Sequence, residues 1–286
     1  MQIENPDRDI VARAVARALA EDHADEDITT RNTVPPGLRG TARFLAKADG
    51  VLAGESVVVE AFSQVEPRVD AFDWLVSDGD WFESGTVLGE VHGPVRGILE
   101  AERVALNFLQ QLSGVATATR RYVDAVAGTK AVILDTRKTT PGLRALEKYA
   151  VRCGGATNHR SDLSSMAMIK DNHREALARA GMSLADGVAA IRRAAPGRPI
   201  EVEIDSLDQL EAALEGKPEW VLLDNMSPAD MALAVNATAG RAKLEASGGV
   251  TLVTVRAIAE SGVDAISVGA LTHSSPALDI SLDLSF

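Results

Sequence analysis

Residues 199–224 read PIEVEIDSLDQLEAALEGKPEWVLLD, which is one apolar run, one helical pattern and a second apolar run. Other runs of this kind are AVILD (131–135), MAMIK (166–170), KLEAS (243–247) and DAISVG (264–269), and each precedes a helical pattern or a short final element. Six strand-then-helix units predict parallel strands joined by crossover helices. An α/β barrel is favoured over an open doubly wound sheet, because no glycine-rich dinucleotide turn follows the first strand.

Polar or glycine residues stand at or just after the end of nearly every predicted strand. They are Arg137, Lys138, Lys170, Glu203, Asp224, Ser247, Gly248, Gly249, Ser267 and Gly269, and Val268 lies between the last two. In a barrel the carboxyl ends of all strands share one face, and that face carries the chemistry. These residues are therefore predicted to line one pocket, whereas Glu201, deeper in its strand, is expected to be a structural partner.

The segment 135–173 is a basic island in an acidic protein. It holds seven Lys and Arg against four Asp and Glu, whereas the whole chain carries a net charge of −12. Arg144, Lys148 and Arg152 recur every four residues, and a solvated helix face is the simpler interpretation for Lys148 and Arg152. Arg137 and Lys138 follow a strand and precede Pro141–Gly142, which favours an anion site.

The predicted pocket has two chemically different halves. One half holds Arg137, Lys138, His159, Arg160 and Lys170 and suits a compact dicarboxylate, because guanidinium groups bind carboxylates in pairs. The other half holds Glu203 and Asp224 beside two glycine-bearing strand ends, whose backbone N–H groups favour phosphate. Carboxylates near phosphate indicate Mg²⁺, although an ion pair with Lys138 or Lys170 is the alternative for either carboxylate alone.

The first third of the chain predicts an α+β unit with a mostly antiparallel sheet. A helix is expected over 5–20, a strand over 39–48, and short β runs over 68–92 with turns at Gly79, Gly85, Gly89 and Gly93. A long helix is expected over 98–126, with a possible interruption at Gly114.

Residues 278–285 alternate apolar and polar, which predicts a strand that returns to the first sheet. The predicted domains are therefore residues 1–112, joined by a strand at 276–286, and a barrel over 113–275.

Composition excludes several classes of protein. Aromatic residues make up 4% of the chain, which gives little for stacked-base recognition, and the net negative charge disfavours general binding to nucleic acid or membrane surfaces. No apolar run approaches the length of a membrane span, and the start MQIENPDRD does not resemble a signal peptide. The single Cys153 excludes an internal disulfide and is expected to be a buried or loop thiol. We expect a cytoplasmic protein.

Several long motifs resemble the quinolinate phosphoribosyltransferase family, also called nicotinate-nucleotide pyrophosphorylases. They are LDTRKTTPGLRALEKYAVRCGGATNHRSDLSSMAMIKDNH (134–173), EVEID (201–205), LLDNM (222–226), EASGGV (245–250), SVGALTHS (267–274), DEDITT (25–30) and AERVALNFLQ (101–110). The resemblance covers essentially the whole chain.

The resemblance implies a sandwich-like N-terminal α+β domain, an incomplete barrel and a pentosyltransferase. The reaction would join quinolinate to 5-phosphoribosyl 1-diphosphate with Mg²⁺, giving nicotinate mononucleotide, diphosphate and CO₂ for NAD synthesis. The enzyme would be a homodimer, or an assembly of dimers, in which the N-terminal domain of one subunit caps the barrel of the other.

The resemblance also assigns residues to the two substrates. Quinolinate would be bound by Arg103 from the partner subunit and by Thr136, Arg137, Lys138, His159, Arg160, Met168 and Lys170. The phosphoribosyl diphosphate side would comprise Lys138, Lys170, Glu203, Asp224, Ser247, Gly248, Gly249, Ser267, Val268 and Gly269. Lys138, Glu203 and Asp224 would be catalytic, and the two carboxylates would hold Mg²⁺ mostly through waters and diphosphate.

Three other interpretations remain open from the sequence. A sister group associated with molybdate transport has the same architecture. Lys170 at a strand end also fits a lysine-dependent aldolase or another phosphosugar barrel enzyme, although no protein nucleophile is needed for the transferase reaction. A non-catalytic anion-binding or assembly protein is the third.

Overall fold

The computed structural model describes residues 3–66 and 71–286, which form two compact units. The N-terminal unit combines the chain up to residue 120 with 139–155 and 270–286, and the barrel unit combines 121–138 with 156–269. Within the described ranges, no helix is both long and apolar enough to cross a membrane.

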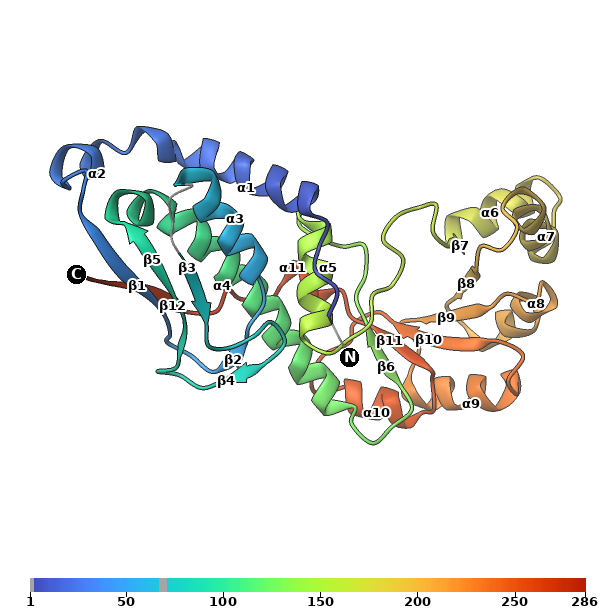
Figure 1. Ribbon diagram of the computed structural model, residues 1–286. Coiled ribbons are helices and arrows are strands. Elements are labelled where there is room, and N and C mark those ends of the chain that lie inside the picture. Colours follow the sequence, from blue (N-terminus) through green and yellow to red (C-terminus); the bar gives the residue numbers. More distant parts are fainter. Residues whose placement is uncertain (1–2, 67–70) are drawn as a thin grey trace. The chain divides into compact units, whose positions relative to one another are not determined.

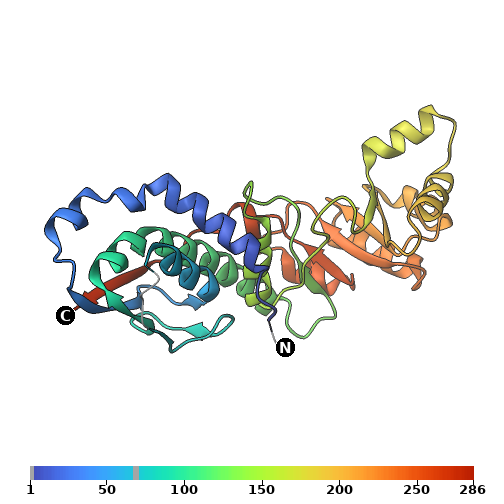
Figure 2. The same ribbon diagram turned by 45° about the horizontal axis from the view of Figure 1, so that its top comes forward.

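The N-terminal unit is built on a four-stranded antiparallel sheet in the order β12-β1-β5-β3. Its strands are β1 (Arg39–Ala46), β3 (Ala71–Trp74), β5 (Val87–Pro94) and β12 (Ile280–Ser285), and β2 (Gly50–Val51) pairs with β4 (Trp81–Phe82). β12 lies beside β1, with Leu284 opposite Ala42 (Figures 1 and 2). The period-two pattern at the end of the chain thus predicted this strand and its partner sheet correctly.

The helices of this unit are α1 (Arg8–Asp22), η1 (Ala24–Glu26), α2 (Ile28–Thr33), α3 (Glu55–Val65), α5 (Arg144–Cys153), α11 (Ala270–His273) and most of α4 (Val95–Ala125). The expected interruption of α4 at Gly114 is wrong, because the helix is continuous over 31 residues. Gly114 instead permits a close approach of the returning chain: a Cβ there would lie 2.1 Å from the carbonyl oxygen of Pro276.

Aromatic side chains join α3 to this sheet. The Phe44 ring stacks on Trp74 with centroids 5.5 Å apart and meets Phe62 edge to face. Gly79 and Gly85 adopt positive φ in turns, as expected. Gly89 and Gly93, however, lie within β5, and Gly89 leaves room for Trp74, because a Cβ there would lie 2.8 Å from that ring.

The barrel unit contains six parallel strands in the order β6-β11-β10-β9-β8-β7. They are β6 (Val132–Leu134), β7 (Ala167–Ile169), β8 (Ile200–Ile204), β9 (Trp220–Asp224), β10 (Lys243–Ser247) and β11 (Ala265–Ser267). The helical elements between them are α6 (Asp171–Arg179), α7 (Leu184–Ala194), η2 (Leu207–Gln209), α8 (Leu210–Glu215), α9 (Pro228–Thr238) and α10 (Val255–Glu260) (Figure 1). β6 and β7 are the two edges of this sheet, so the fold is the predicted incomplete α/β barrel.

The helix after β6 does not belong to the barrel unit by its contacts. Within the N-terminal unit, the Tyr149 hydroxyl of α5 donates to the Asp78 carboxylate, and the Arg152 guanidinium donates to the Glu4 carbonyl at 2.9 Å. Lys148 is 4% exposed, so the expected solvated position is wrong for this lysine. The predicted division between residues 112 and 113 placed 139–155 with the barrel, whereas the structure groups it with the N-terminal unit.

Candidate active site

A cavity of about 600 Å³ lies at the carboxyl ends of the parallel strands of the barrel unit. Its lining comprises Thr136, Arg137, Lys138, His159, Arg160, Met168, Lys170, Glu203, Leu222, Asp224, Asn225, Glu245, Ser247, Gly248, Gly249 and Ser267. Each of the six strands thus contributes a residue at or just beyond its carboxyl end. The parallel arrangement brings these residues together because it turns every strand the same way.

The cationic side of the cavity centres on two arginines. The Arg160 guanidinium donates to the Met166 carbonyl at 2.9 Å and contacts the Met168 sulfur at 3.4 Å. Burial, followed by the charge of Arg137, lowers the pKa of Arg160 below its ordinary value. Two guanidinium groups that repel each other in a half-buried site favour an anionic ligand.

His159 lies at the base of this side, between two buried glutamates. Its Nε2 is 3.3 Å from a Glu201 carboxylate oxygen and 3.2 Å from a Glu245 oxygen, and its Nδ1 accepts the Arg160 backbone N–H at 2.6 Å. The buried Asp135 carboxylate accepts the His159 backbone N–H at 2.8 Å. Both ring nitrogens are therefore engaged by the protein itself.

The protons of this cluster are shared among three groups. Burial lowers the pKa of His159, but the adjacent Glu201 and Glu245 carboxylates outweigh it and raise the pKa to about 9. Burial and the charge of Glu245 raise the pKa of Glu201. Because Nδ1 accepts an N–H from Arg160, we place the ring proton on Nε2 and the second proton on the glutamate pair.

The cluster of His159, Glu201 and Glu245 also has the spacing of three metal ligands. An imidazole that binds a metal through Nε2 carries its proton on Nδ1. The Arg160 N–H already occupies Nδ1, so we assign a hydrogen-bonded cluster rather than a metal site.

The carboxylate side of the cavity is built by β8, β9 and β10. The Lys170 ammonium lies 2.5 Å from a Glu203 oxygen, and an Asp224 oxygen accepts from the Asn225 amide at 2.9 Å. Asn225 and Gly248 both have positive φ, and a Cβ on Gly248 would lie 2.2 Å from the Asn225 amide oxygen. Only glycine therefore fits at residue 248 beside this asparagine.

These carboxylates fit a hard cation such as Mg²⁺, which prefers a few protein oxygens and completes its shell with water and phosphate. Both side chains line the same cavity, and the Glu203 oxygen is held by a single ammonium group that a phosphate can attract in its place. Glu203 and Asp224 are the residues that would hold the ion.

Two residues that were predicted to line the cavity, Val268 and Gly269, do not line it. The Val268 backbone N–H donates to the Leu134 carbonyl at 2.9 Å and its side chain is buried, so this N–H is used by the sheet. Gly269 follows it. Arg103, which is expected to act from the partner subunit, lies on α4 in the N-terminal unit.

Conversely, Leu222, Asn225 and Glu245 line the cavity but were not expected. Leu222 lies two residues before Asp224, and Glu245 lies two residues before Ser247. Residues two apart in a strand face the same side, so this spacing could have predicted that Leu222 and Glu245 also line the cavity.

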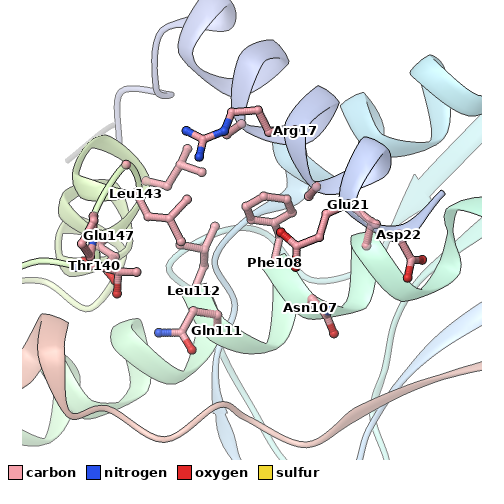
Figure 3. A pocket seen from close by; sticks show the side chains of 16 residues that line it. Arg17, Glu21, Asp22, Asn107, Phe108, Gln111, Leu112, Thr140, Leu143 and Glu147 are labelled. Atoms are coloured by element: carbon pink, nitrogen blue, oxygen red, sulfur yellow. The ribbon is translucent and has the colours of Figure 1, made fainter. Parts of the chain in front are cut away.

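A second cavity, of about 590 Å³, lies in the N-terminal unit between α1, α4 and residues 140–147 (Figure 3). Its centre is apolar, with Phe108, Leu112 and Leu143, and its charged residues are mostly acidic. It does not gather several cations, so the cavity of the barrel unit is the better candidate for an anionic substrate.

Comparison with known proteins matches both units. Family models described as the C-terminal and N-terminal domains of quinolinate phosphoribosyl transferase match residues 115–283 and 27–113. The chain is 47% identical to a nicotinate-nucleotide pyrophosphorylase (carboxylating) of Mycobacterium leprae, over 96% of this chain and 98% of that one.

Solved structures agree with the sequence relatives. The nicotinate-nucleotide pyrophosphorylase from Francisella tularensis is 38% identical and superposes with a TM-score of 0.92, covering 100% of this chain and 99% of that chain. NadC from Streptococcus pyogenes is also 38% identical, with a TM-score of 0.93 and 99% coverage of both chains.

Proposed function

The chain belongs to the quinolinate phosphoribosyltransferase family, and from this we propose how its residues perform the reaction. The enzyme transfers the phosphoribosyl group of 5-phosphoribosyl 1-diphosphate to quinolinate with decarboxylation, giving nicotinate mononucleotide, diphosphate and CO₂ in NAD biosynthesis. The comparisons give no support to the molybdate-transport-associated alternative. One observation carries the assignment of the site: paired arginines and paired carboxylates face one cavity.

Quinolinate carries two adjacent carboxylates, and the cationic side offers groups to match them. Arg137 and Arg160 provide planar donors, and Lys138 and Lys170 add charge from the neighbouring strand ends. Thr136 and Met168 shape the walls, and Arg103 completes the site from the partner subunit of a homodimer. Expulsion of water by the bound ring strengthens each of these ion pairs.

The phosphoribosyl diphosphate lies on the other side of the cavity. The loops at Ser247, Gly248 and Gly249 and the end of β11 at Ser267 approach the phosphate groups, because glycine leaves the backbone accessible. Glu203 and Asp224 would hold Mg²⁺ here, and the ion would add positive charge beside the departing diphosphate.

The chemistry requires stabilisation of charge rather than a protein nucleophile. Positive charge develops on the ribose as its C1–O bond breaks, and Glu203 and Asp224 stabilise it, whereas Lys138 and Lys170 stabilise the leaving diphosphate. The pyridine nitrogen forms the new bond to C1. As CO₂ leaves, the electron pair of the C–C bond stays on the ring carbon, where the positive ring nitrogen stabilises it, and a proton from water then completes nicotinate mononucleotide. Decarboxylation therefore follows sugar transfer.

The test is incubation of the purified protein with 5-phosphoribosyl 1-diphosphate, Mg²⁺ and either quinolinate or nicotinate. We expect nicotinate mononucleotide and an equal amount of CO₂ from quinolinate alone. We also expect the enzyme to be cytoplasmic and to need no added membrane for activity. Product from nicotinate alone would contradict the dicarboxylate site, and product from neither would contradict the transferase assignment.

A further inference from the structure

Two glutamates of the cavity floor have no role in the reaction described above. Glu201 lies on β8 and Glu245 on β10, on either side of β9, and they are 0% and 2% exposed. Both Glu201 oxygens lack a regular hydrogen-bond partner, yet one of them faces His159 at 3.3 Å. Buried carboxylates are costly to retain, so their presence here needs a reason.

His159 connects these strands to the loop that carries Arg160. Its ring faces the two glutamates through Nε2 and the Arg160 amide through Nδ1, and its backbone N–H binds the Asp135 carboxylate at the end of β6. Its two ring nitrogens and its backbone N–H are thus directed to the protein. Arg160 in turn reaches Met166 and Met168 at β7.

We propose that Glu201 and Glu245 are positioning residues of the quinolinate site, which hold the imidazole of His159 and thereby fix the loop that presents Arg160. The inference rests on the proposed function and assigns a different role to His159: it braces the arginine and does not itself donate to the substrate carboxylates. The pair also supplies negative charge near Arg137 and Arg160 while the cavity has no ligand, because clustered guanidinium groups repel one another.

The two properties of a glutamate, its acceptor oxygen and its charge, can be separated by substitution. Glu245→Gln keeps an oxygen for the His159 N–H and removes the charge, whereas Glu245→Leu removes both. Because Glu245→Leu leaves the His159 ring without this acceptor and frees the loop that presents Arg160, we expect it to raise the Kd of quinolinate by about 10-fold to 100-fold. We expect Glu245→Gln to raise it by about 3-fold, and Glu201→Gln to behave in the same way.

The matched control is Glu219→Gln. Glu219 accepts the Ile200 N–H at 2.8 Å at the opposite end of the same strand pair, so it supports β8 without touching the cavity lining. Quinolinate Kd is measured by titration calorimetry, and the KM of both substrates by turnover. We expect the KM for phosphoribosyl diphosphate to stay within about twofold in every variant, as the two substrates occupy different sides. Equal increases in both KM values, or no change in either substitution of Glu245, would overturn the proposal.

A measurement on the unsubstituted enzyme keeps the proposal testable if Glu245→Leu does not fold. The chain has five histidines, so ring ¹⁵N spectra are sparse, and His159→Gln identifies the signal. We expect Nε2 to carry the ring proton before and after quinolinate is added. A ring nitrogen of His159 that gains a hydrogen bond on quinolinate binding would contradict the inference.

These experiments distinguish the positioning role from the proposed function. If quinolinate binds with the expected pattern but no nicotinate mononucleotide forms, the proposed function fails and the positioning role stands. If turnover is normal and the KM pattern is absent, only the positioning role fails. If quinolinate does not bind, both fail.

Discussion

The cavity has an exposed mouth, with Lys138, Lys170, Glu203 and Asp224, and a buried floor, with His159, Glu201 and Glu245. The two regions use charge in different ways. At the mouth, Lys170 is 45% exposed and its pairing with Glu203 is a simple contact between two side chains. On the floor, His159 is held by two strands and a backbone amide, and Glu201 has no exposure to solvent. Charges at the mouth can therefore exchange partners when substrate arrives, whereas charges on the floor keep the geometry fixed.

The largest expected effect is at the mouth. Lys138→Ala removes a cation from the side where diphosphate charge develops, so we expect kcat to fall by about 10²-fold to 10³-fold with little change in stability. Steady-state kinetics and a thermal melt check this together. A loss of activity that follows a loss of folded protein would show that Lys138 supports the fold instead.

The next effect is the loss of paired donors at the base of the cationic side. Arg160→Lys keeps a positive charge but loses the planar guanidinium that contacts Met166 and Met168. We expect the KM for quinolinate to rise by about 10-fold or more, because a lysine cannot replace a bidentate contact. An unchanged KM in this variant would mean that Arg160 contributes only charge.

The His159 cluster on the floor of the cavity should make the stability of the protein depend on pH. The pKa of His159, and with it the shared second proton of the His159–Glu201–Glu245 cluster, is raised from an ordinary value of 6.5 to about 9. The stabilisation by this proton is fully present below pH 6.5 and is lost as pH rises through about 9. We expect the free energy of unfolding of the unsubstituted protein to fall by up to about 3 kcal/mol over this range, relative to His159→Gln. Parallel curves for the two proteins would contradict the shared-proton cluster.

A smaller effect is expected at the glycine loop. Gly248→Ala introduces a methyl group against Asn225 at a positive φ, which costs about 1–2 kcal/mol locally. We expect the KM for phosphoribosyl diphosphate to rise several-fold while quinolinate Kd is unchanged. If quinolinate binding weakens equally, the two sides of the cavity are not independent.

Cys153 should give the smallest effect, because it belongs to neither region. Burial raises the pKa of its thiol to about 12, so the thiolate is scarce at neutral pH. We expect alkylating reagents to leave both the native thiol and the activity unchanged over hours. Rapid modification with loss of turnover would contradict this.

The mouth was largely predictable from sequence and the floor was not. Parallel strands align their ends, so Lys170, Glu203 and Asp224 could be placed in one cavity from strand order alone. Strand parity also indicated that Glu201 is internal, but not that it faces His159, since that pairing depends on how far the 158–160 loop folds back.

Elsewhere, the failures have a common cause. The burial of Lys148 and the packing of Gly89 and Gly114 depend on which distant segment lies against them. The local sequence pattern shows which side of a helix or strand is apolar, but it does not show which distant segment packs against that side.

The central claim is that the cationic side recognises two adjacent carboxylates on a ring. The most direct test compares equilibrium binding of quinolinate, nicotinate and benzene-1,2-dicarboxylate, which has both carboxylates but lacks the reacting nitrogen. We predict that the benzene dicarboxylate binds within about 10-fold of quinolinate, and that nicotinate binds at least about 10-fold more weakly, because it lacks one charge-assisted pair. Equal binding of nicotinate and quinolinate would contradict the account.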